Sequence, residues 1–249
     1  MVDKLLGAHG LTHRFGGLVA VNDVSLDLTQ GEVHAVIGPN GAGKSTLINI
    51  LSGEVRAASG TVELLGGDVS RLSQPRRALA GLGRSYQRST IFQQLTVLEN
   101  CRLAAQARLQ RPWAIWSAAR RCAFSTVSAR QAVERAGLEE EAAVLAGHLP
   151  HGKKRLLEVA VCLATRPRVL LLDEPMSGMG PEETERMLAL FAQLKSDHAT
   201  LLVEHDMDAV FRIADRITVM VNGAVIASDI PERVRANPDV QRAYLGHGH

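Results

Sequence analysis

The first part of the chain alternates apolar and polar residues and then turns into short, continuously apolar runs. Residues 5–24 alternate around the pair Gly16 and Gly17, a pattern that predicts strands at the edge of a sheet. Residues 33–37 are apolar in the main and lead into a glycine-rich loop, after which residues 47–51 carry the spacing of a helix packed on a sheet. This stretch predicts the order strand, glycine loop, helix.

The rest of the chain predicts a helical region followed by buried strands. Residues 74–164 are rich in alanine and arginine and predict helices. The apolar runs 169–172 and 200–203 are typical of central parallel strands, and a helix is predicted between them over 181–194. Near the end, Asn222-Gly223 separates two alternating apolar runs, which predicts a β-hairpin.

Composition narrows the class of protein. The 249 residues are 46% hydrophobic and 4% aromatic, as in an ordinary soluble α/β protein. Because 28 basic residues nearly balance 26 acidic ones, no strong field favours nucleic acid, and no nucleic-acid partner is expected. We expect neither a signal peptide nor a membrane-spanning run, so any membrane would be spanned by a partner. Cys101, Cys122 and Cys162 lack metal-ligand spacing and are expected to be reduced thiols in the cytosol.

The glycine-rich loop carries the first chemical signal. It satisfies the pattern G-x-x-x-x-G-K-[ST] between a predicted strand and a predicted helix, where backbone N–H groups and the helix dipole bind phosphate. Lys44 is expected to reach the β- and γ-phosphates, and Ser45 to offer its hydroxyl to Mg²⁺. The predicted nucleotide-binding residues are Gly38, Pro39, Asn40, Gly41, Ala42, Gly43, Lys44, Ser45 and Thr46.

A pair of acids directly follows the predicted strand 169–172. Asp173 is expected to supply a carboxylate to the Mg²⁺ shell, and Glu174 to polarise the attacking water. The alternative is that the pair only caps the end of the strand. A phosphate loop with such a pair is compatible with a kinase, a GTPase or a transport ATPase, so further motifs are needed.

Further motifs, in order over nearly the whole chain, resemble the ATP-binding-cassette (ABC) family. The resemblance implies that Gln87, in GRSYQRSTIF, senses Mg²⁺ and the attacking water. It implies that His205, after the strand 200–203, contacts the γ-phosphate, and that Phe15 stacks on adenine. Each residue has a simpler alternative: a solvated glutamine, a structural histidine, or a phenylalanine in the core.

The element order and this resemblance imply one fold class. It is an α/β fold of the P-loop NTPase type, with a mostly parallel core sheet, an N-terminal antiparallel β subdomain and an inserted helical subdomain. We expect a single nucleotide-binding domain over residues 1–249. Residues 1–88 and 165–249 would form the core with its antiparallel edge, and residues 89–164 the helical subdomain.

The helical subdomain would carry the family's signature segment, here LPHGKKR over residues 149–155. In the family this segment begins a helix that caps the nucleotide of a second subunit, so Pro150, His151 and Gly152 are expected to contact ATP in trans. Three positions depart from the pattern: Pro150 replaces serine, Lys153 replaces glutamine, and Gly180 replaces the aspartate that follows the acidic pair. These departures affect the trans contacts and not the nucleotide site.

Within the family, stretches such as RFGGLVAVNDVSL, LPHGKKRLLEVA and NPDVQRAYLG look most like the ATPase of branched-chain amino-acid uptake systems. Close relatives serve urea and other small amides or acids. The resemblance implies an ATP-hydrolysing importer subunit, with ATP and Mg²⁺ as cofactors, at the cytoplasmic face of the inner membrane as a peripheral protein. The implied partners are membrane permease subunits, a second identical or related ATPase subunit, and an extracytoplasmic solute-binding protein. Residues 89–98 either receive a permease helix or fill the helical subdomain.

Two other functions fit the same fold. A soluble clamp on nucleic acid or ribosomes would usually carry two cassettes or long coiled coils, and the sequence has neither. An ATP-binding regulatory module is motivated by Pro150, Lys153 and Gly180, whereas Glu174 and His205 argue against it. The stretch RPWAIWSAARR is basic and aromatic, and we expect a packed helix there rather than a membrane-surface one.

Overall fold

The computed structural model describes residues 3–87, 90–109 and 123–245, so Cys122 and the stretch RPWAIWSAARR lie outside the described residues. The described strands form two sheets, one in the order β2-β1-β4-β5 and one in the order β10-β9-β3-β8-β7-β6. The strands are β1 (Lys4–Phe15), β2 (Leu18–Thr29), β3 (Val33–Ile37), β4 (Ser59–Leu64), β5 (Gly67–Asp68), β6 (Leu82–Arg84), β7 (Val169–Asp173), β8 (Ala199–Val203), β9 (Arg216–Val221) and β10 (Ala224–Asp229). The helices are α1 (Lys44–Ser52), α2 (Gln74–Leu79), α3 (Val97–Leu109), α4 (Ala123–Arg135), the 3₁₀ turn η3 (Ala146–His148), α5 (His151–Ala164), α6 (Pro181–Leu194), α7 (Met207–Ile213), α8 (Pro231–Ala236) and α9 (Pro238–Leu245).

The larger sheet determines where the loops meet. Strands β9, β3, β8, β7 and β6 pair in parallel, and only β10 runs antiparallel to its neighbour β9 within the described sheet. Strands β3, β7 and β8 are buried along their whole length, as expected of central strands. Because parallel strands end at one edge of a sheet, the loops after β3, β7 and β8 lie close together.

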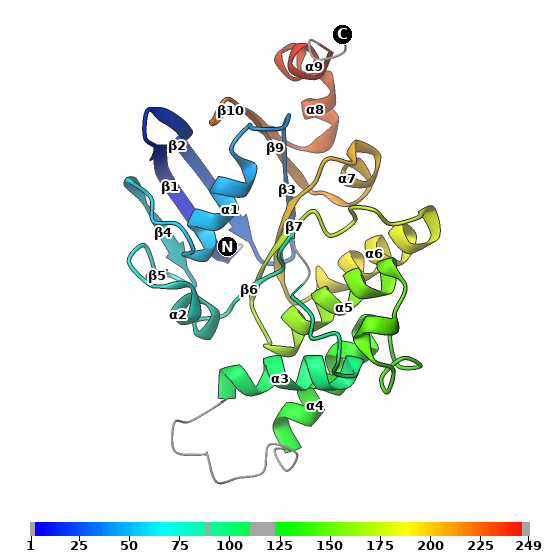
Figure 1. The fold of residues 1–249 in the computed structure, drawn as a ribbon. Helices are drawn as coiled ribbons and strands as arrows, with labels where there is room; N and C mark the ends of the chain where they lie inside the picture. Colours follow the sequence, from blue (N-terminus) through cyan, green and yellow to red (C-terminus); the bar gives the residue numbers. More distant parts are fainter. Residues whose placement is uncertain (1–2, 88–89, 110–122, 246–249) are drawn as a thin grey trace.

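The smaller sheet packs on α1 and on one face of the core sheet. Its first two strands form a hairpin around Gly16 and Gly17, with Phe15 paired to Leu18. Apolar side chains from this sheet, from α1 and from β7 form one cluster, as Leu28, Ile48 and Leu171 illustrate. Figure 1 shows this sheet on the left of the molecule, with α1 between it and the core strands.

The helices α3, α4 and α5 form a helical layer; in Figure 1, α3 and α4 lie at the bottom of the view and α5 lies above them. Their cluster joins α6 and the other face of the core sheet, where Leu157, Leu172 and Phe191 are fully buried. Cys101 and Cys162 lie in this layer as free thiols, and burial raises the pKa of both to about 12. The prediction of free thiols is confirmed for these two cysteines.

The α/β fold class is confirmed, although several elements differ from the sequence prediction. The helical prediction over residues 74–164 is wrong at Leu82–Arg84, which forms β6 at the edge of the core sheet. A strand of three residues is too short to show an alternating pattern in the sequence. Its last residue, Arg84, donates from Nη1 to Glu54 Oε2 (2.6 Å) in the segment after α1. Strands β4 and β5 and helices α7, α8 and α9 were not predicted from the sequence. Within the described ranges, no helix combines the length and apolar character needed to cross a bilayer.

Candidate nucleotide site

The phosphate loop lies between β3 and α1 in a conformation that requires glycine. Gly43 has φ 100°, and a Cβ there would lie 2.2 Å from the carbonyl oxygen of Ala20. A Cβ on Gly38 would lie 2.1 Å from the carbonyl oxygen of Met220. Neighbouring backbone therefore approaches both ends of the loop, and only glycine leaves the loop free to curl with its amides toward a phosphate.

Lys44, the first residue of α1, turns back over the loop. Its Nζ donates to the carbonyl oxygens of Gly38 (2.7 Å) and Pro39 (3.1 Å). Burial lowers the pKa of Lys44, and the nearby charges of Glu174 and Asp173 oppose that shift. The ammonium is therefore held at the loop by neutral acceptors, which an anionic phosphate can replace with a stronger charge-assisted hydrogen bond.

A cavity of about 630 Å³ opens over the phosphate loop. It brings together Phe15, Gln87 and Glu174 with most of the predicted loop residues. A larger groove of about 910 Å³ lies among α4, α5 and α6, but it contains no phosphate-binding motif. We therefore assign the nucleotide to the smaller cavity. Its lining is Phe15, Leu18, Val19, Ala20, Asn40, Gly41, Ala42, Gly43, Lys44, Ser45, Thr46, Gln87, Glu174 and Asn222.

Asp173 ends β7 as a buried carboxylate. Only 4% of its surface is exposed, and its buried Oδ1 has no hydrogen-bond partner among the described residues. Burial raises the pKa of Asp173, whereas the charge of Arg84 lowers it. The backbone N–H of Asp173 donates to Ser85 Oγ (3.2 Å). An unpartnered carboxylate oxygen beside a phosphate site is a ligand that suits Mg²⁺, and the Ser45 hydroxyl in the cavity suits it as well.

Glu174 has a left-handed backbone conformation, which is unusual for a residue other than glycine. Its φ is 50°, which costs on the order of 1–3 kcal/mol for a residue other than glycine. Its N–H donates to the carbonyl oxygen of Val203 (2.8 Å), and its Oε2 accepts from Gln87 Nε2 (3.2 Å). The two predicted catalytic residues Gln87 and Glu174 are therefore in direct contact in the cavity.

His205 follows β8, beside the acidic pair. The β7–β8 register places Asp173 opposite Val203, so Glu174 and Glu204 directly follow the ends of neighbouring strands. The His205 side chain is 60% exposed and does not line the cavity. His205 therefore lies outside the lining of the cavity, just after β8, with an exposed ring.

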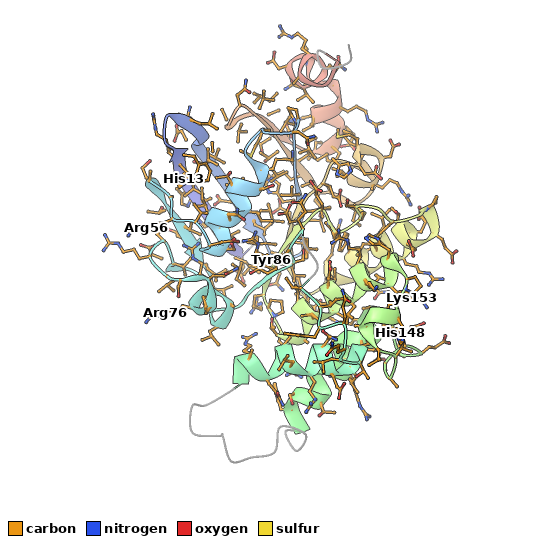
Figure 2. The ribbon with its side chains drawn as sticks, in the orientation of Figure 1. His13, Arg56, Arg76, Tyr86, His148 and Lys153 are labelled. Carbon is orange, nitrogen blue, oxygen red and sulfur yellow. The ribbon has the colours of Figure 1, made fainter. Side chains whose placement is uncertain are left out.

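The signature segment does not take part in this cavity. Pro150 caps α5, which begins at His151, and neither they nor Gly152 line the cavity. Lys153 forms an ion pair with Glu141, on the side of the molecule where Figure 2 labels His148 and Lys153. A Cβ on Gly152 would lie 2.0 Å from the carboxyl carbon of Glu183 on α6, a contact that the sequence analysis did not predict.

The fold and this site define a P-loop ATPase of the ATP-binding-cassette type. A family model described as "ABC transporter" matches residues 21–177, and one described as "Branched-chain amino acid ATP-binding cassette transporter" matches residues 224–249. The chain therefore belongs to the ABC transporter family and is an ATP-hydrolysing, ATP-binding subunit of that family.

Known relatives match the chain from end to end. It is 42% identical to the high-affinity branched-chain amino acid transport ATP-binding protein LivG of Salmonella typhimurium, over 99% of each chain. It is equally identical, 42% over 99% of each chain, to the corresponding protein BraF of Pseudomonas aeruginosa. Among solved structures, the ADP conformation of MJ1267, an ATP-binding cassette of an ABC transporter, superposes with a TM-score of 0.86 at 27% identity. That match covers 98% of this chain and 100% of the other.

The position of Phe15 leads to a first prediction. Its ring is 54% exposed at the mouth of the cavity and packs edge-on against His13, with ring centroids 4.6 Å apart. If the ring stacks on adenine, Phe15→Ala should weaken ATP binding about 10-fold, while Phe15→Tyr should bind like the wild type. Titration with a fluorescent ATP analogue measures both. Equal ATP affinity of the wild type and Phe15→Ala would show that the ring does not contact the nucleotide.

Proposed function

We propose that the chain is the ATPase subunit of an importer for branched-chain amino acids or a related small amide or acid. The observation that carries this proposal is the 42% identity over 99% of both chains to the Salmonella protein whose name specifies that solute class. The match of residues 224–249 to the branched-chain family model supports it independently of the catalytic motifs. The solute itself would be selected by other subunits.

The geometry of the cavity supports a hydrolytic role for each residue. Glu174 would orient and deprotonate the attacking water, and Gln87, already bonded to its carboxylate, would fix that side chain. Lys44 would bind the β- and γ-phosphates, and the exposed side chain of His205 would turn toward the γ-phosphate. Asp173 and Ser45 would hold Mg²⁺, with Gln87 near its shell. When bound, Mg²⁺ would neutralise phosphate charge during transfer.

The proposed assembly contains membrane permease subunits, a second identical or related ATPase subunit and an extracytoplasmic solute-binding protein. In it the chain is peripheral, at the cytoplasmic face of the inner membrane. Pro150, His151 and Gly152 lie outside the cavity of their own chain, so the nucleotide they would contact is that of the second subunit. In this chain Gly152 is buried against Glu183. In residues 90–98, Val97 is buried in the helical layer, whereas Phe92 is 57% exposed and could contact the permease.

The rate of MgATP hydrolysis as a function of protein concentration tests the paired assembly. If two chains complete each site, the rate of the purified protein should rise faster than linearly with concentration. A strictly linear rate would contradict catalysis by pairs. Clear ATP binding without hydrolysis at any concentration would instead favour the regulatory alternative or a chain that requires its permease.

Solute uptake by the native host tests the cargo. A strain that lacks this chain should lose uptake of labelled leucine, isoleucine and valine, and wild-type protein expressed from a plasmid should restore it. Glu174→Gln, as the matched control, should not restore it. Loss of urea or amide uptake alone would show that the transported solute belongs to that class. Unchanged uptake of every solute tested would contradict the importer role.

A further inference from the structure

Glu204 is a buried acid that connects two catalytic loops. It directly follows β8, and only 1% of its surface is exposed. Its Oε1 accepts from the backbone N–H of Met176 (2.8 Å), two residues beyond Glu174. Its Oε2 accepts from the backbone N–H of His205 (3.1 Å). One carboxylate thus bonds the loop after β7 to the loop after β8.

The loop after β7 needs such an anchor, because Glu174 has a strained backbone. Its φ of 50° persists only when neighbouring contacts fix the chain on both sides. On one side, the N–H of Glu174 donates to the carbonyl oxygen of Val203 (2.8 Å). On the other side, beyond Pro175, the next backbone N–H is that of Met176, which Glu204 holds. The two contacts therefore enclose the strained residue.

A carboxylate is a costly choice for a purely structural anchor at this position. Burial raises the pKa of Glu204, and the negative charge of Glu174 raises it further, while the two backbone bonds and His205 oppose the shift. His205 Nδ1 lies 3.8 Å from Oε2 on a ring that is 60% exposed, and among the described residues no lysine or arginine pairs with Glu204. A buried acid without a close buried cation reduces stability, so a contribution to the reaction gives a reason for its presence.

We propose that Glu204 is a positioning residue for ATP hydrolysis. By accepting from the Met176 and His205 amides, it sets the relative position of the water-activating carboxylate of Glu174 and the ring of His205. It touches neither substrate nor reacting atoms, since it lies outside the lining of the cavity. The inference rests on the ATPase activity and is independent of the transported solute.

Two variants test this role by separating catalysis from binding. Glu204→Gln keeps one acceptor oxygen and should lower kcat about 10-fold, and Glu204→Leu removes both acceptors and should lower it about 100-fold, because a misplacement of about 1 Å costs that much. The Kd for ATP should stay within about two-fold, because the phosphate loop is untouched. Hydrogen exchange should accelerate at the Met176 and His205 amides.

The melting temperature distinguishes a positioning role from a purely structural one, because loss of a purely structural contact would lower it together with kcat. Glu204→Gln removes a buried charge and should leave the melting temperature unchanged or raise it, even as kcat falls. The matched control is Glu32→Gln at the start of β3. Glu32 is 9% exposed and also accepts a backbone bond, from Thr29 N–H (2.9 Å). It lies outside the lining of the cavity and differs from Glu204 in that it pairs with Arg216 Nε (3.1 Å). Glu32→Gln should leave kcat unchanged.

Three outcomes would overturn the proposal. They are a wild-type kcat in Glu204→Gln, a parallel loss of kcat, ATP affinity and melting temperature, and an equal loss of kcat in Glu32→Gln. The glutamine variant keeps the test decisive even if the leucine variant does not fold, since its volume matches that of the acid.

Discussion

Changing Glu174 to Gln is expected to lower ATP turnover at least about 100-fold and to leave ATP binding nearly intact. The carboxylate lines the cavity beside the phosphate loop, where it can accept a proton from the attacking water. An amide of the same size can still accept from Gln87 but is too weak a base to take that proton. Steady-state phosphate release and ATP titration on the same preparation measure the two effects.

The same variant should also accumulate as a closed dimer with ATP, because hydrolysis would reopen the pair. Size-exclusion chromatography with MgATP detects that species. Glu182→Gln is a suitable control, since Glu182 is an 82% exposed side chain on α6 that pairs only with Arg186 in the described structure. Wild-type turnover in Glu174→Gln would remove Glu174 from the role of general base and would leave its strained backbone without an explanation.

The residues whose placement the sequence predicted best are those whose motif specifies both side chain and backbone conformation. The phosphate loop needs glycines at close approaches such as Gly43 and a lysine at the start of a helix, so its sequence specifies its shape. Asp173 and Glu174 were predictable because a strand of the core sheet must end at the shared edge. Gln87 was predicted from the resemblance, and the structure adds its bond to Glu174.

The features that sequence could not predict depend on packing between distant segments. An acid after a strand is usually solvated, so Glu204 gave no signal, and its burial depends on how β7 and β8 align. Asn222 was recognised only as a turn residue, although the hairpin places it in the lining of the cavity. Likewise Lys153 was recorded as a departure from the signature, but its pairing with Glu141 required the helical layer to be assembled.

Lys153 and Glu183 also bear on the trans contacts of the signature segment. Lys153 is engaged by Glu141 within its own chain, and Glu183 Oε2 accepts from the N–H of Gly180 (3.0 Å) while its carboxyl group faces Gly152. An acidic side chain is therefore present three residues after Gly180, beside the start of α5. Lys153 and Gly180, two of the departures that motivated a regulatory role, therefore each lie next to an acidic side chain of the same chain, Glu141 and Glu183.

Replacing Lys44 by Ala is expected to weaken ATP binding about 10- to 100-fold and to lower turnover further. A hydrogen bond from a charged donor contributes about 1.5–3 kcal/mol, and in transfer the γ-phosphate gains charge that the ammonium stabilises. Lys44→Arg keeps the charge, but its planar group does not fit a loop built around one Nζ, so turnover should stay low. The ATP-dependent rise in melting temperature measures the loss of binding.

Two possible effects of removing Lys44 must be separated: a looser phosphate loop and a lost contact with the nucleotide. Lys44 Nζ also donates to Gly38 and Pro39, so its loss could loosen the loop without any phosphate contact. Loosening alone would lower the melting temperature without ATP, whereas loss of the phosphate contact would reduce only the rise that ATP produces. Lys195→Ala removes a lysine that pairs with Asp215 away from the cavity and should change neither quantity. An undiminished ATP-dependent rise in Lys44→Ala would show that the lysine supports the loop and does not bind the nucleotide.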